Sequence, residues 1–150
     1  MFKHILLATN GSESAQKAED HALYLTRISG VALTVVHVID DSLCHYGHVD
    51  QLVSGESKDS FVAYVISEAE AASREIINEF SRKAASLDVE YSLISRHGEV
   101  AVEIAAAAKQ AQADLIIMGG QHPVRGKRVR FATLADNVTA QTACNTMILR

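Results

Sequence analysis

The chain has 150 residues, 48% of them hydrophobic, and its formal net charge at pH 7 is −4. This length and composition provide a full core for one domain, which we expect to span residues 1–150. The acidic balance gives no indication of nucleic acid or an anionic membrane surface as a partner.

Cysteine content indicates a reducing compartment, and the short apolar runs give no indication of a membrane span or a signal peptide. The two cysteines, Cys44 and Cys144, are too few and too far apart to predict a disulfide framework. The apolar segment at residues 1–8 is too short for a signal peptide, and no apolar run approaches the roughly 20 residues that span a bilayer. We therefore expect a soluble, unprocessed, cytoplasmic protein.

Short apolar runs alternate with amphipathic stretches, which predicts alternating strands and helices. The expected order is a strand at 5–8, a helix between Ser12 and Gly30, a strand at 32–38, a helix at 60–87, a strand at 89–95, a helix at 99–111, a strand at 115–118, a helix beginning at Thr133 and a strand at 146–149. Ser12 or Ser14 can cap the first helix, and Gly30 ends it. Several strands are apolar throughout, as strands covered on both faces are.

The middle of the chain carries two further expectations. Residues 39–59 form the longest irregular stretch, and the sequence leaves open whether it closes over a ligand or is disordered. In the helix at 60–87, apolar residues recur at three- and four-residue steps as one stripe, which we expect to face a sheet. The stripe consists of Phe61, Val65, Ala69, Ala72, Ile76 and Phe80.

The alternation predicts an α/β fold with a doubly wound, mainly parallel sheet of five strands and four helices. In such sheets the ligand crevice lies at the carboxyl ends of the strands, where the strand order reverses. The loops after Ala8, Val38 and Met118 are therefore the expected location of a site.

The segment from residue 115 to 133 gives the clearest indication of a ligand. An apolar strand runs into Gly119-Gly120, and a basic loop then leads to the helix that Thr133 is expected to cap. A strand, a glycine and a helix start in this order present backbone N–H groups to a phosphate. Lys127, Arg128 and Arg130 either contact such an anion or form a solvated surface.

Four segments in order resemble the universal stress protein family. Residues 3–13 contain Asn10-Gly11-Ser12-Glu13 where the family usually has Asp-Gly-Ser-Glu. Residues 35–38 resemble its second strand, which commonly ends Leu-His-Val, while 114–119 and 143–150 resemble its fourth and last strands. The resemblance covers the whole chain and implies a Rossmann-like sheet of order 3-2-1-4-5. It also implies a homodimer, formed through the C-terminal edge strand.

The family's nucleotide motif is similar to a glycine, two residues, a glycine, nine residues, a third glycine and a serine or threonine. This chain keeps the length of the motif, with Gly119 and Thr133 at its ends, but His122 and Ala132 replace the second and third glycines. An imidazole at 122 can obstruct a phosphate, whereas Ala132 adds one methyl group. Asn10 replaces an aspartate and loses its charge.

Two functions follow from this resemblance. The chain is either a stress-response interaction module whose degenerate motif no longer binds ATP, which we favour slightly, or a signalling module that binds ATP or AMP with altered phosphate contacts. The candidate nucleotide pocket consists of Thr9, Asn10, Val38, Met118, Gly119, His122, Ala132, Thr133 and Leu134.

Neither catalysis nor metal binding has good support in the sequence. The chain contains no Gly-x-Ser-x-Gly elbow, no Walker-type loop, no His-Glu-x-x-His and no Cys-x-x-Cys, so we do not expect an enzyme. Cys44, His45 and His48 lie close together, but no obvious further ligand completes a metal site.

Overall fold

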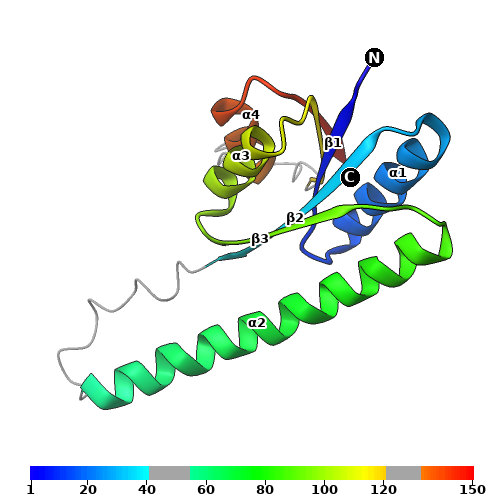
Figure 1. Ribbon diagram of the computed structural model, residues 1–150. Helices are drawn as coiled ribbons and strands as arrows, with labels where there is room; N and C mark the ends of the chain where they lie inside the picture. The colour runs from blue at the N-terminus through cyan, green and yellow to red at the C-terminus, as the bar shows by residue number, and fades with distance from the viewer. Residues whose placement is uncertain (41–54, 121–132) are drawn as a thin grey trace, which may run out of the picture.

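A computed structural model describes residues 1–40, 55–120 and 133–150 as a parallel sheet covered by helices on both faces (Figure 1). The five strands have the order β3-β2-β1-β4-β5. They are β1 His4–Ala8, β2 Ala32–Asp40, β3 Ser92–Gly98, β4 Leu115–Gly119 and β5 Asn145–Leu149. The predicted strand order and four-helix count are confirmed for these residues, which form the helices α1 Glu13–Ser29, α2 Gly55–Ser86, α3 Val100–Gln110 and α4 Leu134–Gln141.

The strand order reverses at β1, which lies at the centre of the sheet. Ala8 pairs with Val36 of β2 on one side and with Met118 of β4 on the other. From β1 the chain proceeds outward to β2 and β3, and then returns to build β4 and β5 on the opposite side. The carboxyl ends of β1, β2 and β4 therefore meet at one edge, where a doubly wound sheet leaves room for a ligand.

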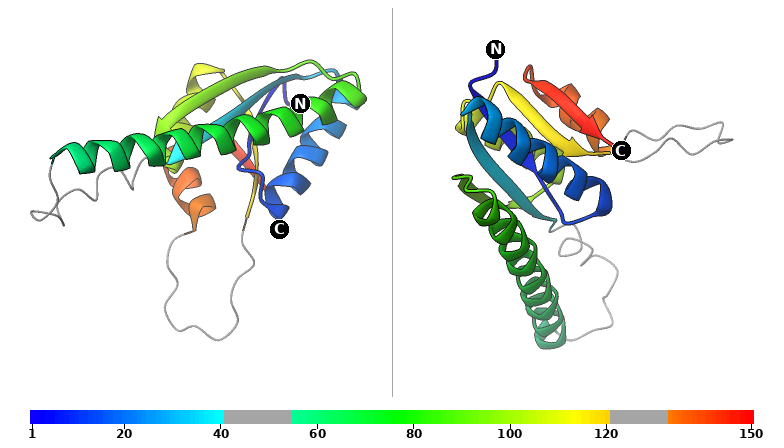
Figure 2. Two further views of the ribbon diagram at one scale, coloured as in Figure 1. Left: turned by 90° about the horizontal axis from the view of Figure 1, so that it is seen from below. Right: turned by 90° about the vertical axis from the view of Figure 1, so that its right-hand side faces the viewer.

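Alternate residues of each central strand face two separate cores. Ile5 and Leu7 of β1 pack with residues of α1 and α2, whereas Leu6 and Ala8 pack with residues of α3 and α4. The two helix pairs lie on opposite faces of the sheet (Figure 2). Because both faces are covered, β1 is apolar from Ile5 to Ala8 and β4 is apolar from Leu115 to Met118, as their composition predicts.

Local signals place most helix ends where the sequence predicts them. Of the two candidate caps for α1, Ser12 is the N-cap, and its hydroxyl accepts a hydrogen bond from the Ala15 N–H at 3.3 Å. The helix ends at Gly30, whose φ of 68° is left-handed. Glu99 and Thr133 are the N-cap residues of α3 and α4.

The predicted bounds of the third strand, 89–95, and of the irregular stretch before α2 are wrong. The third strand begins at Ser92 rather than at 89, because Val89 belongs to the turn that ends α2: its N–H donates to Ala84 O at 2.9 Å. The irregular stretch predicted at 39–59 is too long, since Asp40 pairs with Gly98 in the sheet and α2 begins at Gly55. The part of that stretch at 41–54 lies outside the described residues.

The predicted apolar stripe of α2 faces the sheet only in its C-terminal part. Phe80 is 1% exposed, but Phe61 is 64% exposed and Ala72 is also exposed. The N-terminal part of α2 extends beyond the sheet, which leaves no strand beneath it (Figures 1 and 2). The expectation that the whole stripe is buried is therefore wrong.

Candidate functional site

A crevice of about 630 Å³ lies at the carboxyl ends of β1, β2 and β4. Its residues come from these three strands, from the start of α1 and from the helices α3 and α4. The volume lies within the range of small-molecule sites, roughly 300–1,000 Å³. The crevice is therefore where the strand order predicts it.

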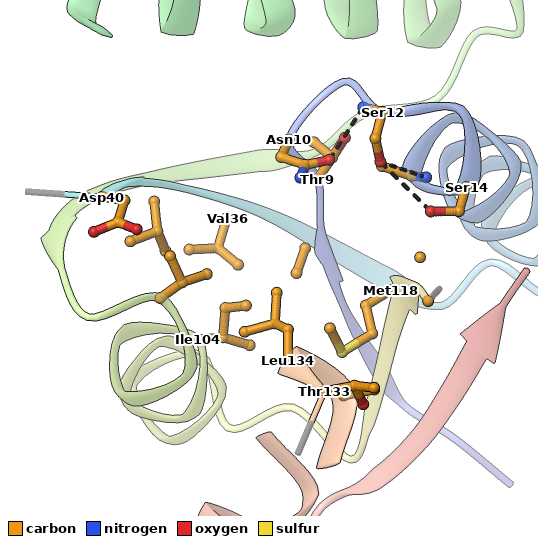
Figure 3. Close-up of a pocket in the computed structure, with 17 residues that line it drawn as sticks. Thr9, Asn10, Ser12, Ser14, Val36, Asp40, Ile104, Met118, Thr133 and Leu134 are labelled. Atoms are coloured by element: carbon orange, nitrogen blue, oxygen red, sulfur yellow. Dashed lines mark hydrogen bonds between the residues drawn. The ribbon is translucent and has the colours of Figure 1, made fainter. Parts of the chain in front are cut away.

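One wall of the crevice is apolar. Val36 and Val38 of β2 form one part of it, and Ile104 of α3 and Leu134 of α4 lie opposite (Figure 3). Met118 lies at the end of β4, beside these side chains. A wall of this kind accommodates a flat, weakly polar group such as a nucleobase.

The rim near the start of α1 is polar. Asn10 Oδ1 accepts a hydrogen bond from the Ser12 N–H at 3.0 Å, which fixes the turn after β1. The hydroxyl groups of Ser12 and Ser14 lie 3.5 Å apart and line the crevice with Asn10 (Figure 3). Asp40 lies at the end of the crevice away from Ser14, on the side of Val36 (Figure 3).

Thr133 adds a hydroxyl group from α4. Its side chain accepts a hydrogen bond from the Asp136 N–H at 3.2 Å, and the Thr133 N–H donates to Asp136 Oδ2 at 2.9 Å. These two bonds form a capping box, which fixes the local conformation at the start of α4, and Thr133 lines the crevice there. A helix N-terminus offers unpaired N–H groups and a positive dipole end, which suit an anion.

Gly119 has a packing role that its place in the motif does not reveal. A Cβ atom at this position would lie 2.5 Å from the Ala15 backbone nitrogen and 2.6 Å from the Ser14 carbonyl carbon. The absence of a side chain therefore lets the first turn of α1 approach the end of β4. This approach brings Ser12 and Ser14 to the rim.

Thr9 lines the crevice, but its hydroxyl group is directed to α1. Thr9 Oγ1 donates to Glu19 Oε1 at 2.6 Å, and the Thr9 carbonyl oxygen is 2.9 Å from His37 Nδ1, which donates to it. All three residues are buried. Thr9 therefore links the crevice to a polar group inside the protein.

The structure brings together every predicted pocket residue that it describes: Thr9, Asn10, Val38, Met118, Gly119, Thr133 and Leu134 all line the crevice. His122 and Ala132 lie outside the described residues, as do Cys44, His45 and His48. The predicted pocket lacked several residues that line the crevice, among them Ser12, Ser14, Val36, Asp40 and Ile104. The position of Asp40 after an apolar strand is a signal that could have indicated it, whereas Ile104 belongs to a distant helix with no local signal.

The described part of the chain contains neither a cluster of metal ligands nor a membrane-spanning helix. Residues 1–40, 55–120 and 133–150 contain no group of three or more His, Cys, Asp or Glu side chains that could hold a metal ion. Among the helices formed by the same residues, none is both long and apolar enough to cross a membrane.

A profile of the Universal stress protein family matches residues 1–150. Because this match covers the whole chain, the chain belongs to the universal stress protein family, as its motifs predict. The Universal stress protein YxiE of Bacillus subtilis (strain 168) is 25% identical over 150 residues, which are 100% of both chains.

Two solved structures with the same fold contain a bound nucleotide. One is a universal stress protein in complex with cAMP, with a TM-score of 0.69 and 16% identity over 99% of this chain and 97% of that one. The other is a universal stress protein family protein from Arabidopsis thaliana with AMP bound. Its TM-score is 0.64 and its identity is 16%, over 98% of this chain and 90% of that one.

Proposed function

We propose that this chain is a regulatory module that binds an adenine mononucleotide such as AMP in the crevice and does not turn it over. The observation that carries this proposal is the division of the crevice into an apolar wall at Val36, Val38 and Leu134 and a polar rim at Ser12 and Thr133. An adenine nucleotide has the same division into a flat base and a polar sugar phosphate.

The proposed orientation follows from this division. The base lies against the apolar wall, and the phosphate lies near the hydroxyl groups and the N-terminus of α4. The spacing of Gly119 and Thr133, which keeps the length of the family motif, supports this orientation. Two proteins with the same fold carry cAMP and AMP, which supports the choice of an adenine mononucleotide.

We favour AMP over ATP because of three sequence differences. His122 and Ala132 stand where the family motif has glycine, and Asn10 stands where it has aspartate. A bulky residue in a phosphate loop obstructs additional phosphates, and the loss of a carboxylate removes a ligand for a metal-bound triphosphate. The same differences, with the absence of known catalytic motifs from the sequence, support a module without turnover.

Calorimetric titration of AMP tests the proposal with two matched variants. Leu134 and Val102 are both 39% exposed and both lie in helices, but only Leu134 lines the crevice. Leu134→Glu places a carboxylate in the crevice and should weaken AMP binding at least about tenfold, a loss of about 1.4 kcal/mol. Val102→Glu should leave the affinity unchanged.

Absence of AMP binding by the parent at millimolar concentration would contradict the proposal. Equal losses in the two variants would contradict the location of the site. GMP serves as the control for the base, and ATP and ADP test the preference for one phosphate. A parent that binds ATP more tightly than AMP would contradict our choice of ligand.

An interaction module without nucleotide is the second candidate function. The observation that favours it is the exposure of Phe61 and Tyr64 on the part of α2 that extends beyond the sheet. In this case the variant with Asn10→Asp, His122→Gly and Ala132→Gly should bind ATP, while the parent binds no adenine nucleotide. A triple variant that gains no ATP binding would remove the support for a lost site.

We also propose that two copies pair through β5, the C-terminal edge strand. The outer edge of this strand has no neighbouring strand within the described sheet, and an unpaired edge tends to pair with another chain. Sedimentation equilibrium should therefore give twice the mass of one chain. A monomer mass that does not depend on concentration would contradict this assembly.

A further inference from the structure

A buried carboxylate connects α1 to α2 beneath the crevice. Glu19 of α1 is 4% exposed and lies among the alanines that face the sheet. Its Oε2 atom accepts a hydrogen bond from Lys83 Nζ of α2 at 2.8 Å, and its Oε1 atom accepts one from Thr9 Oγ1 at 2.6 Å. Both carboxylate oxygens are therefore paired, which a buried charge requires.

Lys83 is held in its charged form by this arrangement. Partial burial is the largest single influence and lowers the pKa of Lys83, but the hydrogen bonds and charges of Glu19 and Asp20 together raise it. Asp20 Oδ1 lies 3.4 Å from Lys83 Nζ and its side chain is 69% exposed. Lys83 thus has one buried and one solvated carboxylate partner.

Thr9 connects Glu19 to the turn at the rim of the crevice. Its hydroxyl oxygen accepts a hydrogen bond from the Gly11 N–H at 3.3 Å, in addition to the bond that it donates to Glu19. The Thr9 backbone N–H donates to the Val36 carbonyl oxygen at 3.2 Å, and the Thr9 carbonyl oxygen accepts a hydrogen bond from His37 Nδ1. The turn that follows Thr9 carries Asn10 and Ser12, both of which line the crevice.

A second contact joins α2 to the same turn. Gly11 has a φ of 75°, and a Cβ atom placed there would lie 3.0 Å from Ile76 Cγ1. The side chain of Ile76 therefore packs directly on the backbone of the turn. The helix α2 thus reaches this turn at two points, through Ile76 and through Lys83 with Glu19.

We propose that Glu19 and Lys83 are positioning residues of the crevice. Through Thr9 they hold the turn that carries Asn10 and Ser12, so that α2 sets the affinity of the crevice without contacting the ligand. This role deepens the function proposed above and rests on it. Because coupling between two sites is reciprocal, ligand binding also strengthens the attachment of α2.

Hydrogen exchange of the ligand-free protein tests the positioning role without any nucleotide. Lys83→Met removes the cation, and Asp20→Asn removes only the solvated partner of the same lysine. In Lys83→Met, exchange of the Gly11 and Ser12 amides should accelerate at least about fivefold relative to the core amides of Ile116 and Ile117. Asp20→Asn should show no such acceleration.

Exchange at Gly11 and Ser12 that stays unchanged in Lys83→Met would overturn the proposal. A uniform acceleration that includes Ile116 and Ile117 would overturn it as well, because it indicates only a loss of global stability. Lys83→Arg keeps the charge and should restore protection of the turn. These outcomes do not depend on whether the protein binds AMP.

A double-mutant cycle tests the consequence for binding. Lys83→Met and Thr9→Val should each weaken AMP binding at least about fivefold, the lower end of the usual range of coupling between sites. The double variant should bind no more weakly than Thr9→Val alone, because both substitutions interrupt one chain of contacts. Independent, additive losses, or an unchanged affinity in Lys83→Met, would overturn the proposal.

The two experiments separate this inference from the proposed function. A parent that binds no AMP refutes AMP binding, and the exchange experiment then decides alone whether Glu19 and Lys83 position the turn. A parent that binds AMP with an unaltered affinity in Lys83→Met refutes the positioning role and leaves the proposed function intact.

Discussion

Gly119 affects both the packing of α1 on the sheet and the position of the polar residues at the crevice. The first turn of α1 lies against this residue, and a Cβ atom would approach the Ala15 backbone nitrogen to 2.5 Å. Two of the three nearest atoms, the Ala15 nitrogen and the Ser14 carbonyl carbon, belong to backbone and are unable to yield by a change of side-chain rotamer; the third is Ser14 Oγ. The residue thus determines how closely Ser12 and Ser14 approach the crevice.

We predict that Gly119→Ala destabilises the protein by about 2 kcal/mol or more, because the backbone of α1 or β4 has to move. Gly30→Ala is the matched control: its φ of 68° is left-handed, but nothing lies within 4 Å of the added methyl group. Its cost should be about 1 kcal/mol, from backbone conformation alone. Urea denaturation measures both, and equal losses would contradict the packing role of Gly119.

Two backbone N–H groups of the N-terminal segment stabilise the charged form of Asp114. The His4 and Lys3 backbone N–H groups donate to its carboxylate at 3.0 and 2.8 Å and lower its pKa from the ordinary value. A lowered pKa in the folded state stabilises the protein above about pH 3.9, and this contribution is lost as the pH falls through the folded-state pKa.

We therefore predict that Asp114→Asn is less stable than the parent near neutral pH and that the difference shrinks below about pH 3.9. Denaturant titrations from pH 6 to pH 3 measure the free energy of unfolding of both proteins. A difference that remains constant over this range would contradict an ionic role for Asp114.

The residues of the site were predictable to the extent that they follow strands along the chain. Thr9 and Asn10 follow β1, and Val38 and Met118 lie within two residues of the ends of β2 and β4; this position alone indicates the crevice. Glu19 carried a signal that was missed: it occupies a core position of α1 between Ala18 and Ala22, and a charged residue there requires a buried partner. The identity of that partner depends on how α2 lies against α1, which no local pattern contains.

Among the elements, α2 shows how far periodicity predicts burial. The spacing of apolar residues correctly predicts a helix and the burial of Phe80. The Phe80 ring also packs edge-to-face on the Tyr91 ring, with the ring centroids 5.0 Å apart. The spacing of apolar residues along a helix does not indicate where the sheet beneath the helix ends. Phe61 belongs to the same stripe as Phe80 and is nevertheless exposed, because the N-terminal part of the helix extends beyond the strands.

This difference gives a paired prediction for α2. Phe80→Ala should lower the free energy of unfolding by about 4 kcal/mol, as is usual for a phenylalanine removed from a core. Phe61→Ala should change it by less than about 0.5 kcal/mol. Chemical denaturation measures both, and a large loss in Phe61→Ala would indicate that this side chain is covered in solution.

At the scale of the whole molecule, the sheet predicts the site better than any single motif does. The order of the strands follows from the alternation of apolar runs and amphipathic stretches together with the family resemblance. The order alone places the crevice at the carboxyl ends of β1, β2 and β4. The contribution of α3 through Ile104, and of α2 through Lys83, depends on tertiary packing across the two faces of the sheet.

The proposed positioning role of Lys83 makes α2 a part of the binding module. Its C-terminal part holds the turn after β1, and its N-terminal part exposes Phe61 and Tyr64 beyond the sheet. A ligand that strengthens the attachment of α2 to the turn would therefore alter the element that carries this exposed surface. The crevice and the projecting part of α2 are connected in this way by one continuous helix.

NMR titration of the isotope-labelled protein with AMP shows whether the crevice binds an adenine mononucleotide. We predict the largest shifts at the amides of Asn10, Ser12, Gly119 and Leu134, which line the crevice. Lys109 and Asn145 line a separate hollow and should not shift. Spectra that remain unchanged at millimolar AMP, or shifts confined to Lys109 and Asn145, would contradict binding in the crevice.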